Sequence, residues 1–497
     1  MATGETSTAE PDRIPRRVWI ISGVAMLGAV MSMLDTTIVN VALDTLGKDL
    51  HSSLTQIQWV ITGYMLSLAA VIPVTGWASR RFGAKNVFII SLVLFTFGSL
   101  LCGLATSDTE LILFRVLQGC GGGMIMPLAQ IIMADAAGPK RLGRVMGLVA
   151  VPMMLAPTIG PLLGGAIIQA LNWHWIFYVN LAVGAVAVPL AITLLPGRSG
   201  EHTDTLDFTG LALMSAGLVA VTYGLAEAGT YNSFTNSHVW APVVAGLLLV
   251  VAFAFHALRT KHPLLDLRLY RRWHFTAASI VMLTLAAAVF GAMILMPLYW
   301  QELRGYDVLK TGLLTGPQGL GMVITMPLAS RLTERYGGGP VALAGVVGAA
   351  VTTIPFALIG AHTPVAELCG TMLLRGGAMG FGFMPAMTAA FAALDRNEMS
   401  HATPQLNVLT RIGGSIGTTV LAVVLANAER HTHTPAATAH AFGTAFWWSV
   451  GLAVVAIIPC VVLMRAESNA RKLAKTVGGE DSDRAVLDTG AVAEALV

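Results

Sequence analysis

Charged residues are scarce in this chain. They make up 11% of its 497 residues, whereas 55% of the residues are hydrophobic. A soluble domain carries about 25% charged residues, which it needs to cover its surface, so the composition excludes an ordinary soluble protein. The apolar residues come in blocks of about 20 or more, the length that crosses about 30 Å of hydrocarbon as a helix. The sequence therefore predicts an all-α, polytopic membrane protein.

Cysteines are also few. Cys102, Cys120, Cys369 and Cys460 each lie alone in an apolar block, and no pair has the spacing of metal ligands or of a disulfide framework. We interpret them as small core residues and expect no metal site. The chain also lacks the glycine-rich lysine loop that binds ATP phosphates. We therefore expect no cofactor, no ATP drive and no enzymatic reaction, and we expect no nucleic-acid partner.

Fourteen membrane spans are predicted, and they must be helices because backbone polar groups find no water in lipid. Of the 30 Lys and Arg residues, 23 fall on one side of this topology, four on the other and three within spans. The positive-inside rule then places both termini in the cytoplasm. The predicted spans are 18–43, 56–78, 86–105, 111–134, 143–169, 175–195, 207–226, 240–258, 275–300, 311–330, 340–360, 366–391, 404–427 and 442–464.

Two motifs occur once in each half of the chain. "GWASRRFG" at 76–83 resembles "SRLTERYG" at 330–337, and "FRVLQGCGGGMIMP" resembles "LRGGAMGFGFMP" at an offset of about 258 residues. Parallel repeats of this kind predict a major-facilitator fold; chance similarity between glycine-rich helices is the alternative. The predicted parts are a cytoplasmic segment 1–17, a six-helix bundle 18–195, two inserted helices 207–258, a second six-helix bundle 275–464 and a disordered cytoplasmic tail 465–497.

Asp35, in "MSMLDTTIVNVAL" at 31–43, is the one acidic residue well inside a predicted span. At 1.5 Å per residue it lies about 27 Å from Arg17 and about 13 Å from Asp44, in the outer half of the membrane. Intramembrane ionisable residues usually face a cavity or a partner. Burial disfavours the carboxylate and a neighbouring cation favours it. Asp35 is therefore a candidate proton carrier; the alternative is a permanent ion pair that only holds two helices together.

Arg115 is the candidate partner of Asp35. It lies five residues past Glu110 at the outer end of the fourth span, which places it at a similar depth. Arginine does not deprotonate in proteins. Its expected role is therefore to tune the site and not to carry the proton.

The fifth span contains "APTIGPLLGG" at 156–165. Gly160 with Gly164, and Pro161 with Gly165, form small pairs at i,i+4 spacing. Such pairs make a smooth ridge at a kink, which suits closure of one helix on another. An ordinary glycine interface is the alternative interpretation.

Arg411 is expected near the membrane midplane, with Asn407 one turn earlier. It either faces a substrate cavity or binds carbonyls of an interrupted helix. Methionines adapt to irregular ligands and are suited to a permissive pocket, although such residues more often face lipid or the core. The predicted cavity residues are Asn40, Tyr64, Gln118, Met154, Asn407 and Arg411.

Five strings together resemble the fourteen-helix drug:H⁺ antiporters of the EmrB/QacA type: "LDTTIVNVAL", "QWVITGYML", "RVLQGCGGG", "APTIGPLLGG" and "NWHWIFYVNL". The similarity extends over about 18–465. It implies that Asp35 is a protonation site and that Arg115 takes part in proton coupling. It also implies that Gly160, Pro161, Gly164 and Gly165 form the motif that marks exporters.

The loop after the second span departs from the family pattern. The family usually has G-x-L-A-D-R-x-G-R-K, and this chain has "GWASRRFGAK" at 76–85. Gly76, Arg81, Gly83 and Lys85 match, whereas Arg80 replaces the acid and Ala84 replaces an arginine. This substitution puts in doubt the acid-based charge relay attributed to the loop.

The resulting functional prediction is a proton-coupled exporter of lipophilic drugs, antibiotics or toxic compounds, including cationic ones, that works by alternating access. We expect a monomer in the cell membrane, with protons and the lipid bilayer as its other partners. A proton-coupled importer of a nutrient or siderophore on the same fold is the first alternative. A membrane sensor or scaffold is the second.

Overall fold

The computed structural model describes residues 15–138, 145, 159–160, 162–197, 205–231, 233–392, 394, 396–430 and 434–476. Regular structure in these ranges is helical, so the predicted all-α fold class is confirmed. The first half contains α1 (Arg16–Asp49), α2 (Leu54–Ile57), α3 (Trp59–Val71), α4 (Val74–Phe82), α5 (Ala84–Leu104), α6 (Asp108–Ala137) and α8 (Trp175–Leu194). The inserted pair is α9 (Phe208–Tyr231) and α10 (Ser237–Arg259). The second half contains η2 (Leu267–Arg271), α11 (Trp273–Leu298), η3 (Tyr299–Leu303), α12 (Val308–Tyr336), α13 (Gly338–Ala357), α14 (Val365–Ala392), α15 (Arg396–Glu429) and α16 (Pro435–Thr476).

Ten helices within the described ranges are long and apolar enough to cross a membrane, and the bent pair α3–α4 brings the number to 11. That pair bends by 56° at Pro73, which lacks the N–H that a continuous helix would use. Adding α12 and α14, which have 29 and 28 residues, accounts for 13 of the 14 predicted spans. The fifth predicted span, 143–169, lies largely outside the described residues.

The last helix is longer than the sequence predicts. α16 continues to Thr476, so the first 12 residues of the segment predicted as a disordered tail, 465–476, are helical. The physical reason is that this polar stretch is rich in good helix formers. Glu467 also binds the start of α13, where its carboxylate accepts hydrogen bonds from the backbone N–H groups of Gly338 at 3.0 Å and Gly339 at 2.6 Å. An anion at a helix N-terminus is favourable.

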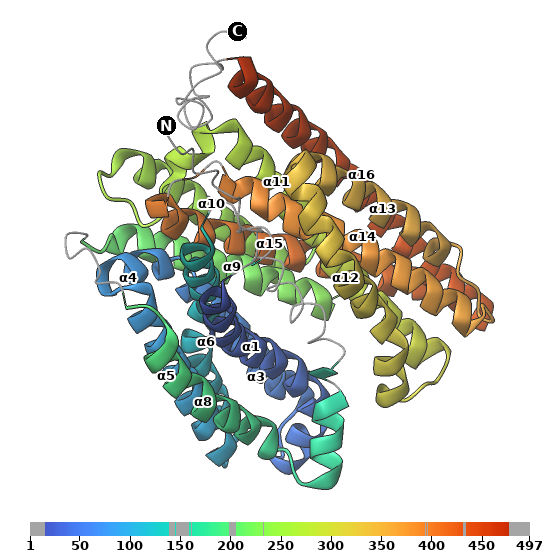
Figure 1. Ribbon diagram of the computed structural model, residues 1–497. Helices are drawn as coiled ribbons and strands as arrows, with labels where there is room; N and C mark the ends of the chain where they lie inside the picture. Colours follow the sequence, from blue (N-terminus) through green and yellow to red (C-terminus); the bar gives the residue numbers. More distant parts are fainter. Residues whose placement is uncertain are drawn as a thin grey trace, which may run out of the picture.

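The two halves share one packing pattern. In the first half, α1 packs on α6 and α8, α3 packs on α6, and α5 packs on α6 and α8. In the second half, α11 packs on α14 and α16, α12 packs on α14, and α13 packs on α14 and α16. The halves form two bundles, blue to green and yellow to red in Figure 1. The arrangement is that of two copies of one helical unit.

The inserted helices connect these bundles. α9 packs on α10 and also touches α3 and α15. The Ser215 hydroxyl donates to the carbonyl of Ala70 at 2.6 Å, and the Thr419 hydroxyl donates to the carbonyl of Leu225 at 3.0 Å. The pair α9–α10 therefore holds one helix of each half.

Among the described residues, the hydrophobic core is continuous between the halves on one side of the molecule and divided on the other. On the side where α1 begins and α16 finishes, here called the terminal side, residues of both halves, such as Ile21 and Phe275, belong to one cluster. On the opposite side, here called the far side, the halves have separate clusters, one around Val39 and Trp173 and the other around Trp300 and Phe442. The two bundles thus meet on the terminal side and diverge from it (Figure 1).

Candidate functional site

α1 carries Asp35 into the interior of the first bundle, where its side chain has no exposed surface. One carboxylate oxygen, Oδ2, accepts a hydrogen bond from Nη1 of Arg115 at 2.6 Å. The other, Oδ1, accepts from Nε2 of Gln118 at 3.0 Å and from Nδ2 of Asn180 at 2.8 Å. Asp35 is therefore held by one charged and two neutral donors, which come from α6 and α8.

Arg115 is as deeply buried as Asp35, with 1% of its surface exposed. Its Nη1 also donates to Oε1 of Gln118 at 2.7 Å, and its Nε donates to the carbonyl of Val60 at 3.2 Å. The guanidinium carbon lies 3.9 Å from the centre of the Tyr64 ring, a distance that allows a cation–π interaction. A buried ion pair is tolerated only when further hydrogen bonds compensate for lost water, and this one has them.

Two residues of this cluster, Asn180 and Ser99, were not predicted from the sequence. Asn180 of α8 donates to both Asp35 and Oγ of Ser99, the latter at 3.0 Å. Ser99 in turn donates to the carbonyl of Phe177 at 2.9 Å. An amide inside the apolar stretch "IFYVNLAVG" is the signal that could have pointed to Asn180, by the same logic that singled out Asp35.

The structure brings Asp35 and Arg115 together, as their matching depths led us to expect. It places two predicted cavity residues differently. Tyr64 and Gln118 have no exposed surface and pack around Arg115, because the desolvated guanidinium needs the amide oxygen and the ring face. In this structure they belong to the buried cluster and not to an open wall.

The glycines of the fifth span pack on α1 directly after Asp35. A methyl group at Gly160 would overlap the side chain of Thr37, and one at Gly164 would lie 3.1 Å from the carbonyl oxygen of Ile38. At Gly165, no described atom lies within 4 Å of such a methyl group. The other predicted members, Pro161 and Met154, lie outside the described residues.

The 76–85 loop motif lies on the terminal side. A methyl group at Gly76 would overlap the backbone oxygen of Ser400 on α15, and Arg80 donates to Oγ of Ser400 at 3.4 Å. Gly83 has φ of +83°, which glycine adopts without a Cβ penalty. Lys85 donates to the carbonyls of Ile192 at 2.7 Å and Leu195 at 2.9 Å, at the end of α8.

Arg81, the remaining predicted residue of this motif, lies next to Arg80 in the last turn of α4. Gly76 and Arg80 thus connect the first half with α15, and Lys85 holds α8 within the first half.

The remaining predicted cavity residues are Asn40, Asn407 and Arg411. Asn407 of α15 donates to Oε1 of Gln130 on α6 at 2.7 Å and so joins the two halves. Asn40 and Arg411 are exposed although each lies inside a long apolar helix.

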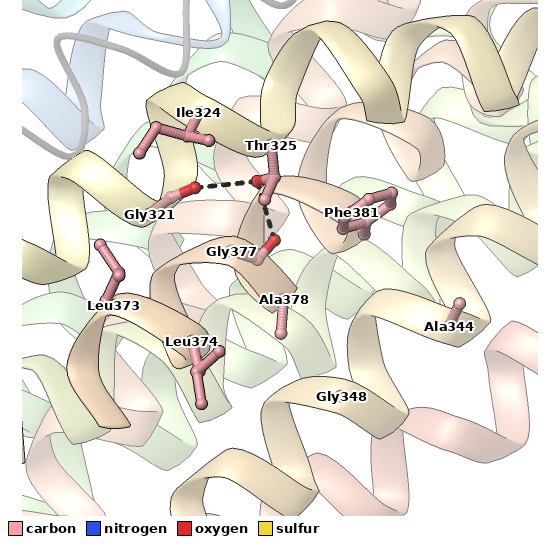
Figure 2. Close-up of a pocket in the computed structure, with 10 residues that line it drawn as sticks. All are labelled: Gly321, Ile324, Thr325, Ala344, Gly348, Leu373, Leu374, Gly377, Ala378 and Phe381. Carbon is pink, nitrogen blue, oxygen red and sulfur yellow. Dashed lines mark hydrogen bonds between the residues drawn. The ribbon is translucent and has the colours of Figure 1, made fainter. Parts of the chain in front are cut away.

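A separate apolar hollow of about 480 Å³ lies on α12, α13 and α14 (Figure 2). Its polar atoms are already paired, since the Thr325 hydroxyl donates to the carbonyls of Gly321 and Gly377, both at 3.0 Å. Ile324, Leu374 and Phe381 contribute apolar surface. The hollow presents no charged side chain and lies apart from the Asp35 cluster.

Comparison with known proteins identifies the class. Residues 25–418 match the family model of the Major Facilitator Superfamily. The chain belongs to this superfamily and is a multi-pass membrane transporter.

Among individual relatives, the "Multidrug resistance protein B homolog" of Mycobacterium tuberculosis is 38% identical over 425 residues, which are 85% of this chain and 79% of that protein. The "Multidrug export protein EmrB" of Haemophilus influenzae is 29% identical over 410 residues, 82% of this chain and 80% of that protein. A double-tryptophan mutant of XylE has the same fold, with a TM-score of 0.63 at 14% identity, over 91% of this chain and 98% of that structure.

Proposed function

We propose that this protein exports lipophilic small molecules, including drugs and antibiotics, in exchange for protons. Relatives named as multidrug resistance and multidrug export proteins support the substrate class. The observation that carries the proton coupling is the buried Asp35, whose charged partner among the described residues is Arg115 at 2.6 Å. We also propose that the bundles 18–195 and 275–464 are the units that move, in a monomer of the cell membrane with cytoplasmic termini.

Protonation of Asp35 would disturb the whole cluster. A neutral carboxyl is a weaker acceptor, so Arg115 would lose its charged partner while still buried, and an unpaired buried charge is costly. To give the guanidinium of Arg115 a new partner or water, α1, α6 and α8 would have to shift relative to one another. Because Gly160 and Gly164 pack on Thr37 and Ile38 of α1, the fifth span would follow that shift. In this way a proton would change the packing of the helices that close the pathway.

The state of the pathway follows from where the halves touch. Asn407 bonds to Gln130, and Arg80 bonds to Ser400, on the terminal side. The Lys and Arg distribution favours cytoplasmic termini. The halves are then in contact on the cytoplasmic side and apart on the outer side, which is an outward-facing state of the transporter. Each proton that enters through 100 mV supplies about 2.3 kcal/mol.

The test is transport in inside-out vesicles under an imposed pH gradient, with a panel of lipophilic dyes. Wild-type protein should accumulate dye, and Asp35→Asn at equal expression should lose at least nine-tenths of the gradient-driven uptake. Glu110→Gln is the matched control, since it makes the same change at an exposed position at the start of α6. If Asp35→Asn retains full gradient-driven uptake, Asp35 is not the proton site. If wild-type vesicles lose dye instead of accumulating it, the protein is an importer.

A further inference from the structure

Arg411 lies deep in the membrane and yet is exposed. It is 15 residues after the first residue of α15, Arg396, or about 22 Å along the helix at 1.5 Å per residue. Its side chain is exposed, whereas Val408 of the same helix is 4% exposed and packs in the cluster formed with α3 and α9. A charge at this depth is costly unless it faces a water-filled cavity or a partner.

The neighbours on α15 show which way Arg411 faces. Gly413 packs on α11 at Leu283, and Val408 packs toward α9. Asn407, one helical turn before Arg411 and on the same face, donates to Gln130 of α6. Arg411 therefore faces the first bundle, just beyond the contact that closes the terminal side.

Arg411 has no partner in the described part of the chain. Within the ranges that the structure describes, no side chain forms a hydrogen bond or an ion pair with it. Asp35 is not available, because it has no exposed surface and all its described bonds go to Arg115, Gln118 and Asn180. Arg411 is thus an exposed cation deep in its helix, whereas Asp35 is fully buried inside the first bundle.

We infer that Arg411 binds the anionic group of the substrate and that the protein prefers lipophilic anions such as aryl carboxylates. This inference rests on the proposed export function. A guanidinium matches a carboxylate with two parallel hydrogen bonds. Phe290 lies against Gly414, one turn after Arg411, with its ring 6.2 Å from that of Phe383. An apolar ring system would lie against the half-buried Phe290, which the buried Phe383 supports, while its carboxylate meets Arg411. The sequence analysis included cationic compounds among the substrates, and the assignment adds a preference for anions.

Substrate charge also sets the charge that moves per cycle. If one proton enters for each molecule that leaves, export of a monovalent anion moves two charges, export of a neutral compound moves one and export of a monovalent cation moves none. A membrane potential that is negative inside would therefore drive anions out most strongly.

The binding test uses one scaffold in three charge states: pyrenebutyrate, pyrenebutanol and pyrenebutylamine. Their fluorescence is titrated with the full chain in lipid nanodiscs, and empty nanodiscs correct for partition into lipid. Wild type should bind the carboxylate at least tenfold more tightly than the amine. Arg411→Gln should weaken carboxylate binding at least tenfold and leave the alcohol within twofold. Arg411→Lys keeps the charge but loses the paired hydrogen bonds, so its carboxylate affinity should fall between those of wild type and Arg411→Gln. Lys310→Gln, which removes an exposed positive charge at the far side, should change nothing.

Three results overturn the assignment: a wild type that prefers the amine, a wild type that does not bind the carboxylate, and an Arg411→Gln that binds the carboxylate as wild type does. Transport of the same compounds in proteoliposomes separates this failure from that of the proposed function. If wild type moves none of the three under a pH gradient, the export proposal fails. If it moves the alcohol or the amine best and Arg411→Gln is unchanged, only the assignment of Arg411 fails.

Discussion

In the described part of the chain, each half buries one arginine in its fourth span, and the two arginines have different partners. Arg115 on α6 is 1% exposed and faces a carboxylate at 2.6 Å. Arg375 on α14 is 2% exposed, and its described partners are neutral: Oγ1 of Thr353 at 3.1 Å and Oε1 of Gln318 at 3.3 Å. The same cation is thus paired with a group that can bind a proton in the first half only.

The close helix contacts made by glycines show the same difference between the halves. In the first half, Gly160 and Gly164 of the fifth span pack on α1 just after Asp35. In the second half, Gly413 and Gly417 of α15, again four residues apart, pack on the backbone of α11 at Leu283 and Ala287. The repeat preserves the close helix contact, but a deep carboxylate adjoins it in one half. We therefore expect proton sensitivity to reside in the first half and the second to serve as its packing counterpart.

The largest effect is expected from Arg115→Gln. This change leaves Asp35 buried without its charged partner, which typically costs about 3–5 kcal/mol. We expect a large drop in the thermal unfolding midpoint of the purified protein and no gradient-driven transport. The double variant Asp35→Asn/Arg115→Gln removes both charges and should recover most of the midpoint while transport stays absent. A single variant as stable as wild type would mean that the pair is not tightly buried.

Gly160→Ala should have the next largest effect. The added methyl group overlaps Thr37, and overpacking of this kind costs about 1–3 kcal/mol. Because the displaced helix adjoins Asp35, the pH at which transport is half-maximal should also move. Gly165→Ala, five residues further along the same span and with no described atom within 4 Å of the added methyl group, is the control and should behave as wild type.

Gly413→Ala gives the corresponding test in the second half. It overlaps the carbonyl of Leu283 and should lower stability as Gly160→Ala does, with no shift in the pH profile of transport. An equal shift in both variants would remove the distinction between the halves.

The smallest effect is expected from Arg375→Gln. No carboxylate in the described part of the chain pairs with this arginine, so its removal leaves no buried anion. Loss of two hydrogen bonds to neutral partners costs about 0.5–1.5 kcal/mol each. The thermal midpoint should fall modestly, and the pH dependence of transport should match wild type. Loss of gradient-driven transport in a folded Arg375→Gln protein would contradict the asymmetry.

Much of the fold was predictable because its signals are local. Runs of about 20 apolar residues mark spans, and 13 of the 14 predicted spans coincide with a helix or a bent pair of helices. The end of α16 was missed because a helix that leaves the membrane carries no hydropathy signal, and polar helix formers resemble a tail.

For the candidate site, too, local signals were predictable and contacts between helices were not. Scarcity of charge pointed to Asp35, and the length of each helix placed Arg115 at its depth, so both members of the buried ion pair could be predicted from the sequence. Their neutral partners could not be predicted. Asn180 is 145 positions from Asp35 in the chain, and no periodicity relates two residues that meet because α1, α6 and α8 pack together. The exposure of each side chain could not be predicted either: Tyr64 is fully buried, whereas Arg411 is exposed. Burial depends on which helix covers which face, and that is a property of the assembled bundles and not of any one helix.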